Sequence, residues 1–173
     1  ELAEELDSDR FRGIMLSQLA ALDDTLGRRE RALERYQRAI SLHERTGDRR
    51  QQQLTLGNMA DLLRKQDRLE DAGELLKRRL SMCRQMESRD GEAAALCSMG
   101  VIMAKTQRLE EAADYYSSAC AIAEEVGLGG HMLRGIAPLY RKLDAEGFPQ
   151  AREHWPTHWD DPEEIVRDSH VEI

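Results

Sequence analysis

The stretch MGVIMAKTQRLEEAADYYSSA, residues 99–119, decides the fold, because its pattern occurs twice more at intervals of 40 residues. The two earlier copies are LAALDDTLGRRERALERYQRA at 19–39 and MADLLRKQDRLEDAGELLKRR at 59–79. Aligning the copies places small residues in two columns and an aromatic residue or leucine in a third. These columns are Ala20, Ala60 and Gly100; Ala32, Ala72 and Ala112; and Tyr36, Leu76 and Tyr116. The shared register identifies an internal repeat.

A fixed period of about 20 to 50 residues is typical of stacked supersecondary units. Each unit contacts its neighbours, and arrays of this kind commonly present extended binding surfaces. We therefore divide the chain according to the period. The divisions are 1–9, the end of a truncated upstream repeat; 10–48, 49–88 and 89–129, three repeats; 130–143, a capping helix; and 144–173, an acidic tail with both tryptophans.

Two amphipathic segments alternate within each period, with apolar residues recurring at three- and four-residue spacing. This pattern predicts helices over 10–25, 29–46, 49–66, 69–86, 90–106 and 109–126. Gly27, Gly47 and Gly127 mark breaks, because glycine readily adopts the left-handed conformation that ends a helix. Such short connections make consecutive helices antiparallel neighbours. The predicted fold is therefore all-α, built from antiparallel helix pairs.

The two ends of the chain depart from the full repeat. Leu2 and Leu6 align with the end of the second helix of a repeat, so residues 1–9 are expected to be the last turns of such a helix. Residues 131–143 repeat the first-helix pattern, but three of the four prolines lie beyond them. Because proline interrupts regular helices, we expect an irregular C-terminal tail after the capping helix.

The acidity of the chain is concentrated in residues 144–173. The formal net charge is −8 at pH 7, and this segment supplies −7 of it, from nine acidic residues and two arginines. The rest of the chain is close to neutral, whereas nucleic-acid binding requires a concentrated basic face. No run of about 18 apolar residues is present to span a membrane. The sequence therefore predicts neither nucleic-acid binding nor membrane insertion.

Candidates for chemistry are few. Cys83, Cys97 and Cys120 are odd in number and lack metal-ligand spacing, which favours reduced thiols in a cytoplasmic protein. His154 and His158 are four residues apart, but Pro156 interrupts the helix that would place both imidazoles on one metal. We therefore predict no enzymatic activity, no metal site and no cofactor.

The repeats resemble the tetratricopeptide repeat family. That family has a leucine followed by a small residue in its first helix, and an alanine, an aromatic residue and a second alanine in its second helix. The corresponding residues are Leu19-Ala20, Met59-Ala60 and Met99-Gly100 in the first helices, with Ala32, Tyr36 and Ala39, and Ala112, Tyr116 and Ala119, in the second helices. The middle repeat departs from the pattern at Leu76 and Arg79.

This resemblance covers about residues 1–143 and implies a right-handed superhelix of helix pairs, an α-solenoid. The usual unit of the family has about 34 residues. A period of 40 implies longer helices, as in a subclass found in cell-polarity scaffolds and in bacterial peptide-sensing regulators.

In this family the first helices line the concave face of the superhelix, and partner peptides lie along it. The resemblance therefore implies a peptide-binding groove. Its lining residues would be Gln18, Asn58, Asp61, Arg64, Lys65, Ser98, Val101, Lys105, Arg134 and Arg141. Gln18, Asn58 and Ser98 share one column and suit hydrogen bonds to a peptide backbone.

The basic residues of this set predict a partner peptide with acidic residues. The small residues Gly57, Ala94 and Cys97 are expected to leave room for apolar anchors. We therefore predict a protein-interaction scaffold or adaptor. The alternatives are a ligand- or peptide-sensing portion of a larger regulator and, as a minor one, autoinhibition by the acidic tail occupying the groove.

Overall fold

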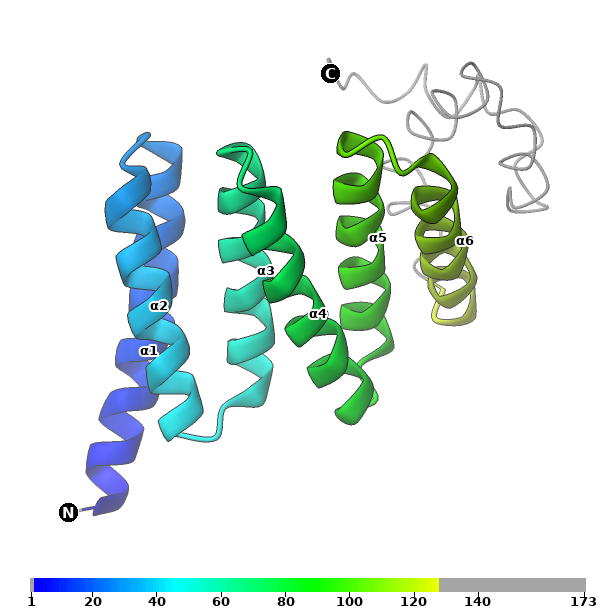
Figure 1. The fold of residues 1–173 in the computed structure, drawn as a ribbon. Helices are drawn as coiled ribbons and strands as arrows, with labels where there is room; N and C mark the ends of the chain where they lie inside the picture. Colours follow the sequence, from blue (N-terminus) through cyan, green and yellow to red (C-terminus); the bar gives the residue numbers. More distant parts are fainter. Residues whose placement is uncertain (1, 128–173) are drawn as a thin grey trace. The chain divides into compact units, whose positions relative to one another are not determined.

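The computed structural model describes residues 2–127, with side chains from Glu4 onwards. Six α-helices follow one another in this range, without any strand (Figure 1). Their bounds are α1 Leu2–Thr25, α2 Arg29–Arg45, α3 Arg49–Lys65, α4 Leu69–Gln85, α5 Arg89–Lys105 and α6 Leu109–Glu125. The predicted all-α architecture of helix pairs is confirmed. The capping helix at 130–143 and the tail at 144–173 lie outside the described residues.

The first helix is longer than predicted. We expected it to begin at residue 10, but α1 is continuous from Leu2. The reason is local, because no glycine or proline interrupts residues 2–9. Glu4 and Glu5 lie in the first turn, where negative charge interacts favourably with the positive end of the helix dipole. The predicted helix boundary near residue 9 is therefore wrong.

A left-handed residue lies two positions after the end of each helix, and these residues recur every 20 positions. Gly27, Gly47 and Gly127 have φ of 72°, 66° and 72°, which confirms the predicted breaks. Asp67, Glu87 and Gln107 have φ of 56°, 54° and 60° at the equivalent positions of the other turns. The backbone amide of the next residue, three beyond the helix end, then bonds a carbonyl of the last turn. Examples are Arg28 N to Asp23 O at 2.8 Å, Arg68 N to Leu63 O at 3.0 Å and Arg108 N to Met103 O at 2.9 Å.

The chain divides into two compact units, Glu1–Met86 and Glu87–Ile173. In the first unit α1 packs on α2, α2 on α3 and α3 on α4, and in the second α5 packs on α6. The small-residue columns of the repeat lie at these crossings and are buried. They include Ala20, Ala32, Ala39, Ala60 and Ala72 in the first unit, and Ala112 and Ala119 in the second. Short side chains let the two helix backbones approach closely.

Two glycines at the helix crossings face a large side chain. A Cβ atom added to Gly100 would lie 2.5 Å from Cε1 of Tyr116, whose ring packs directly on the α5 backbone. A Cβ atom added to Gly13 would lie 2.7 Å from Cε1 of His43. At both positions glycine is required because a Cβ atom would overlap the neighbouring side chain. The backbone conformation does not require it, since φ is not in the left-handed region at either.

The pairing of α1 with α2 also depends on buried carboxylates. Asp23, near the end of α1, is buried and lies within ion-pair distance of three arginines. The distances are 3.7 Å to Arg28 Nη1, 3.4 Å to Arg31 Nε and 2.5 Å to Arg35 Nη1. A buried carboxylate is stable only when it is paired, so this cluster joins the end of α1 to the start of α2.

Candidate partner-binding face

The first helices of the repeats in unit 1, α1 and α3, carry an exposed amide side chain at equivalent positions. These are Gln18 and Asn58, both exposed. Close to them the two helices are joined by a short hydrogen bond, with 2.6 Å between Ser17 Oγ and Thr55 Oγ1. The structure therefore leaves both predicted amides available for contact with a partner.

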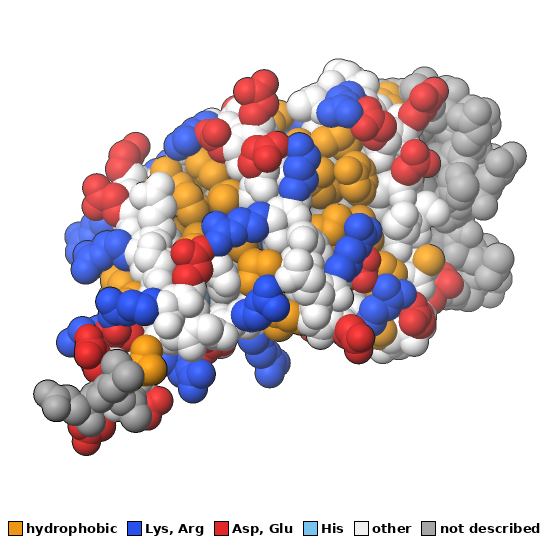
Figure 2. Space-filling model, turned by 60° about the horizontal axis from the view of Figure 1, so that its bottom comes forward, with side chains coloured by type: hydrophobic (Ala, Val, Ile, Leu, Met, Phe, Trp, Pro, Cys, Tyr) orange, Lys and Arg blue, Asp and Glu red, His pale blue; other side chains and the backbone are white. Residues whose placement is uncertain are grey.

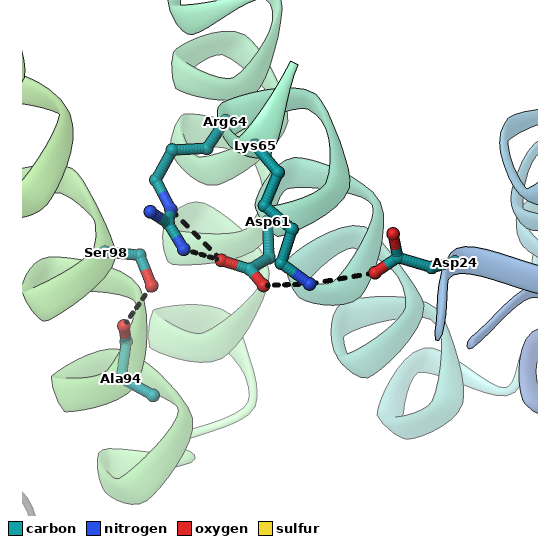
Figure 3. Close-up of polar contacts among 6 residues, drawn as sticks. All are labelled: Asp24, Asp61, Arg64, Lys65, Ala94 and Ser98. Carbon is teal, nitrogen blue, oxygen red and sulfur yellow. Dashed lines mark hydrogen bonds and ion pairs between the residues drawn. The ribbon is translucent and has the colours of Figure 1, made fainter. Parts of the chain in front are cut away.

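Four charged residues form an ion-pair network between α1 and α3 (Figure 3). Lys65 Nζ lies 2.8 Å from Asp24 Oδ2 and 3.4 Å from Asp61 Oδ2. Arg64 Nε donates to Asp61 Oδ1 at 3.0 Å, and Arg64 Nη2 bonds the same oxygen. Two cations thus meet two carboxylates, and the network is formally neutral.

The network shifts the ionisation of groups on two helices. The hydrogen bond to Asp24 is the largest cause that raises the pKa of Lys65 above its ordinary value, and Asp61 contributes further. Burial raises the pKa of Tyr36 to about 12, and the negative charges of Asp24 and Asp61 add to this effect. Lys65 is therefore charged and Tyr36 protonated at neutral pH.

In unit 2 the predicted residues lie on α5. Ser98 is half-buried, and its Oγ donates to the carbonyl oxygen of Ala94 at 3.0 Å (Figure 3). Val101 is half-buried and Lys105 is exposed. The last two predicted residues, Arg134 and Arg141, lie outside the described part of the chain.

The expected room for apolar anchors is partly filled. A Cβ atom on Gly57 would lie 2.5 Å from Nη1 of Arg79, so the guanidinium of α4 occupies that space. Arg79 Nε also donates to Gln53 Oε1 at 3.1 Å. Arg79 replaces the alanine of the other repeats and lies over the glycine of α3. The prediction of an open position at Gly57 is therefore wrong.

The thiols of unit 2 are poorly suited to chemistry. Burial raises the pKa of Cys97 to about 11. Burial, followed by the effects of Cys97 and Glu124, raises the pKa of Cys120 to about 12. A nucleophilic cysteine needs a lowered pKa. Within residues 2–127 no group of three His, Cys, Asp or Glu side chains could hold a metal ion.

Sequence reasoning did not identify the charge pairs, although signals for them exist in the columns. Asp24 aligns with Arg64, and opposite charges at this position of adjacent first helices indicate a charge contact between the helices, which Asp24 makes with the neighbouring Lys65. Asp23 aligns with Leu63 and Met103, so a carboxylate at an apolar position indicates a buried charge with partners.

The surface agrees with the near-neutral composition of the repeats. In the face drawn in Figure 2, Lys and Arg side chains alternate with Asp and Glu, and hydrophobic side chains show between them. None of the described helices has the length and apolar character that a bilayer crossing requires.

Comparison with known proteins supports the repeat assignment. The tetratricopeptide repeat family model matches residues 51–125, which confirms the predicted resemblance there. No curated protein sequence matches the chain. The solved structures listed next are under 20% identical to it, so their likeness concerns the fold.

The first structure is BtubC (BKLC) from P. vanneervenii, with a TM-score of 0.70 and 18% identity over 93% of this chain. The match covers 66% of that protein, so the chain spans slightly less than two thirds of its length. The second contains nearly identical TPR-like repeats of a kinesin-light-chain-type protein from Podosopora anserina. It has a TM-score of 0.68 and 15% identity over 91% of this chain and 75% of that one. Both confirm a solenoid of helix pairs.

Proposed function

We propose that this chain, whose residues 51–125 are tetratricopeptide repeats, is a protein-interaction scaffold or adaptor that binds a partner peptide along its first helices. Tetratricopeptide repeats generally mediate contacts between proteins. The proposed function involves binding without a chemical step. The free thiols Cys83, Cys97 and Cys120 suit a reducing compartment, and we place the protein in the cytoplasm.

The exposed amides of Gln18 and Asn58 carry this proposal. They occupy equivalent positions on α1 and α3, two helices already fixed to one another by the Ser17–Thr55 hydrogen bond. An amide side chain has both a donor and an acceptor. Two such groups on a rigid support suit the backbone of a peptide. Ser98, Val101 and Lys105 of α5, with Arg134 and Arg141, complete the set of proposed peptide-binding residues.

We further propose that the partner carries acidic residues and exchanges with the internal carboxylates. Lys65 is held by Asp24 and Asp61, and Arg64 by Asp61. These contacts are at least partly exposed to solvent, and exposed ion pairs contribute only about 0 to 1 kcal/mol each. An incoming carboxylate can therefore replace one of them at small cost. In the absence of a partner, the internal pairs keep both cations positioned.

Selection from a random peptide library tests the proposal. The 173-residue chain is used as bait, and the dissociation constant of each selected peptide is measured by fluorescence anisotropy. The variant Gln18→Ala with Asn58→Ala removes both amides, and Gln37→Ala, at an exposed position on α2, is the matched control.

We expect the double variant to weaken binding by about thirtyfold, because two hydrogen bonds of about 1 kcal/mol each are lost. Gln37→Ala should leave the affinity unchanged. We also expect the selected peptides to be enriched in Asp and Glu. Equal affinity of the parent and the double variant would exclude this face, and peptides enriched in Lys and Arg would overturn the proposed charge preference.

A further inference from the structure

A second face of unit 1 has the geometry of a helix-docking site. Large apolar residues lie exposed along α1 at spacings of three and four, which places them in one strip of the helix. Phe11 is 65% exposed, Met15 38%, Leu19 37% and Leu22 53%. Single exposed apolar residues are common, whereas a continuous strip indicates a binding surface.

The repeat shows what such a strip does elsewhere in the same unit. Forty residues further on, the equivalents of Met15, Leu19 and Leu22 are Thr55, Met59 and Leu62 of α3. All three are buried, with exposures of 1%, 8% and 0%. The helix α3 packs on α2 and α1, and the contacts include Ser17 to Thr55 at 2.6 Å and Gln52 Nε2 to Glu44 Oε1 at 2.9 Å. The same face of α1 is therefore shaped to receive a helix.

A groove of about 530 Å³ accompanies the strip and lies between α1 and α2. Its apolar lining comes from Met15, Leu16, Leu19 and Leu42. This volume is in the range of ligand pockets, about 300 to 1,000 Å³. It can therefore accept several apolar side chains of an incoming helix.

The polar lining of the groove has an excess of positive charge. Arg12, Arg38 and Arg45 line it together with a single carboxylate, Asp9. Asp9 is buried and pairs with Arg12 at 3.5 Å and with Arg45. Among the described residues, Arg38 has no ion-pair partner, and Arg12 and Arg45 are more than half exposed. Three guanidinium groups thus face the groove with one internal counter-charge.

We propose that this groove and strip bind an amphipathic helix of a partner protein, with apolar residues on one face and acidic residues beside them. The apolar residues would cover Met15, Leu19 and Leu22, and the acidic ones would meet the arginines. Binding of an apolar helix face in a groove is a common mode of recognition. The charge excess selects an acidic helix over a basic one. The groove between α1 and α2 has neither Gln18 nor Asn58 in its lining, although Gln18 borders the strip, three residues from Met15 and four from Leu22 on the same helix.

The probe is a synthetic helical peptide of about 18 residues with leucines on one face and flanking glutamates. A second peptide replaces each glutamate by lysine. Both are titrated into the full chain and into three variants. Leu19→Glu tests the apolar strip, Arg38→Glu tests the charge, and Arg50→Glu is the matched reversal at an exposed position outside the groove lining.

We expect the glutamate peptide to bind the parent and Arg50→Glu equally. Its affinity should fall by at least about tenfold with Leu19→Glu, because hot-spot residues contribute that much. It should also fall with Arg38→Glu and recover when the lysine peptide is used on that variant. Circular dichroism confirms that each variant remains helical.

Three results would overturn the proposal. One is absence of binding to the parent, and another is equal binding to Leu19→Glu. The third is dimerisation of the parent that Leu19→Glu abolishes in sedimentation velocity, because a second copy of the chain would then be the occupant.

Discussion

Lys65 of α3 donates a hydrogen bond to Asp24 of α1, with 2.8 Å between Nζ and Oδ2. The contact connects the first helices of two successive repeats on the side that we propose for peptide binding. It also gives the lysine a counter-charge before any partner arrives. A partner can therefore use the positive charge of Lys65 only if its own carboxylate replaces Asp24 or Asp61.

Removal of that carboxylate should strengthen binding of an acidic peptide. In Asp24→Asn the charge of Lys65 is balanced only by Asp61, at 3.4 Å. We expect the free energy of unfolding to fall by less than about 1 kcal/mol, since the pair is partly exposed. The affinity for an acidic peptide selected on the parent should rise by a few-fold. The control is Asp71→Asn on α4, which breaks the exposed pair with Arg68 just before that helix and should leave the affinity unchanged.

Gly100→Ala should destabilise unit 2. The added methyl group would overlap the ring of Tyr116, with 2.5 Å to the nearest ring carbon. Overpacking of a well-packed core typically costs about 1 to 3 kcal/mol. The control is Gly73→Ala in α4, where an added Cβ has no neighbour within 4 Å. That change should stabilise its helix by roughly 0.5 to 1 kcal/mol. Urea denaturation followed by circular dichroism measures both, and equal effects would contradict the close packing of Tyr116 on Gly100.

His43 should make unit 1 less stable in mild acid. Its side chain is buried, and neither ring nitrogen has a hydrogen-bond partner among the described residues. Burial lowers the pKa of His43 below its ordinary value of 6.5, although Asp48 opposes the shift. Below pH 6.5 the unfolded chain therefore binds a proton that the folded chain does not, so stability is retained above this pH and lost as the pH falls.

The variant His43→Cys isolates this effect, because the equivalent position of the next repeat holds the buried Cys83. Thermal midpoints of both chains are measured from pH 7.5 down to 5, a range chosen to cross the ordinary histidine pKa. The midpoint of the parent should fall more steeply. Parallel curves would show that His43 does not titrate with unfolding.

The thiols of unit 2 should react slowly while the protein is folded. Burial raises the pKa of Cys97 from 9.0 to about 11, which lowers the thiolate fraction at pH 8 by roughly a hundredfold. Cys120, with a pKa of about 12, should be slower still. Labelling with iodoacetamide followed by peptide mass spectrometry, with and without concentrated urea, measures the rates. Cys97 is half-buried, and its rapid labelling in the folded chain would contradict the raised pKa.

The repeat period made most of the fold predictable. The predicted helices at 29–46, 49–66, 69–86, 90–106 and 109–126 agree with α2 to α6 within one residue at each end. This accuracy arises because a helix boundary that is clear in one copy of the repeat lies at the same position in the other copies. The repeat alignment predicts a separate helix end at residues 2–9, because Leu2 and Leu6 align with the end of a second helix. The local sequence, however, contains no glycine or proline to end a helix there.

The left-handed turns at Asp67, Glu87 and Gln107 were not predicted, because only glycine was used as a signal. Their backbone conformation is imposed by the repeat geometry, which overrides the residue preference. The period could have revealed them, since Gly27 aligns with Asp67 and Gln107.

Side-chain contacts between helices were the least predictable part of the site. In the column of predicted amides and hydroxyl, Gln18 and Asn58 are exposed, whereas Ser98 is half-buried. The guanidinium of Arg79 over Gly57 depends on the length of one side chain and the direction it takes. Neither the length nor the direction of that side chain follows from the periodicity, so the prediction of open space at Gly57 failed.

The most direct test of the proposed function observes the two amides themselves. A peptide selected from the library is titrated into the chain labelled with ¹⁵N, and the side-chain NH₂ signals of Gln18, Asn58 and Gln37 are followed by NMR. Their assignments come from the corresponding alanine variants. We predict that the Gln18 and Asn58 signals shift in proportion to bound peptide while the Gln37 signal stays in place. Saturating peptide that leaves both signals unmoved would contradict binding along α1 and α3.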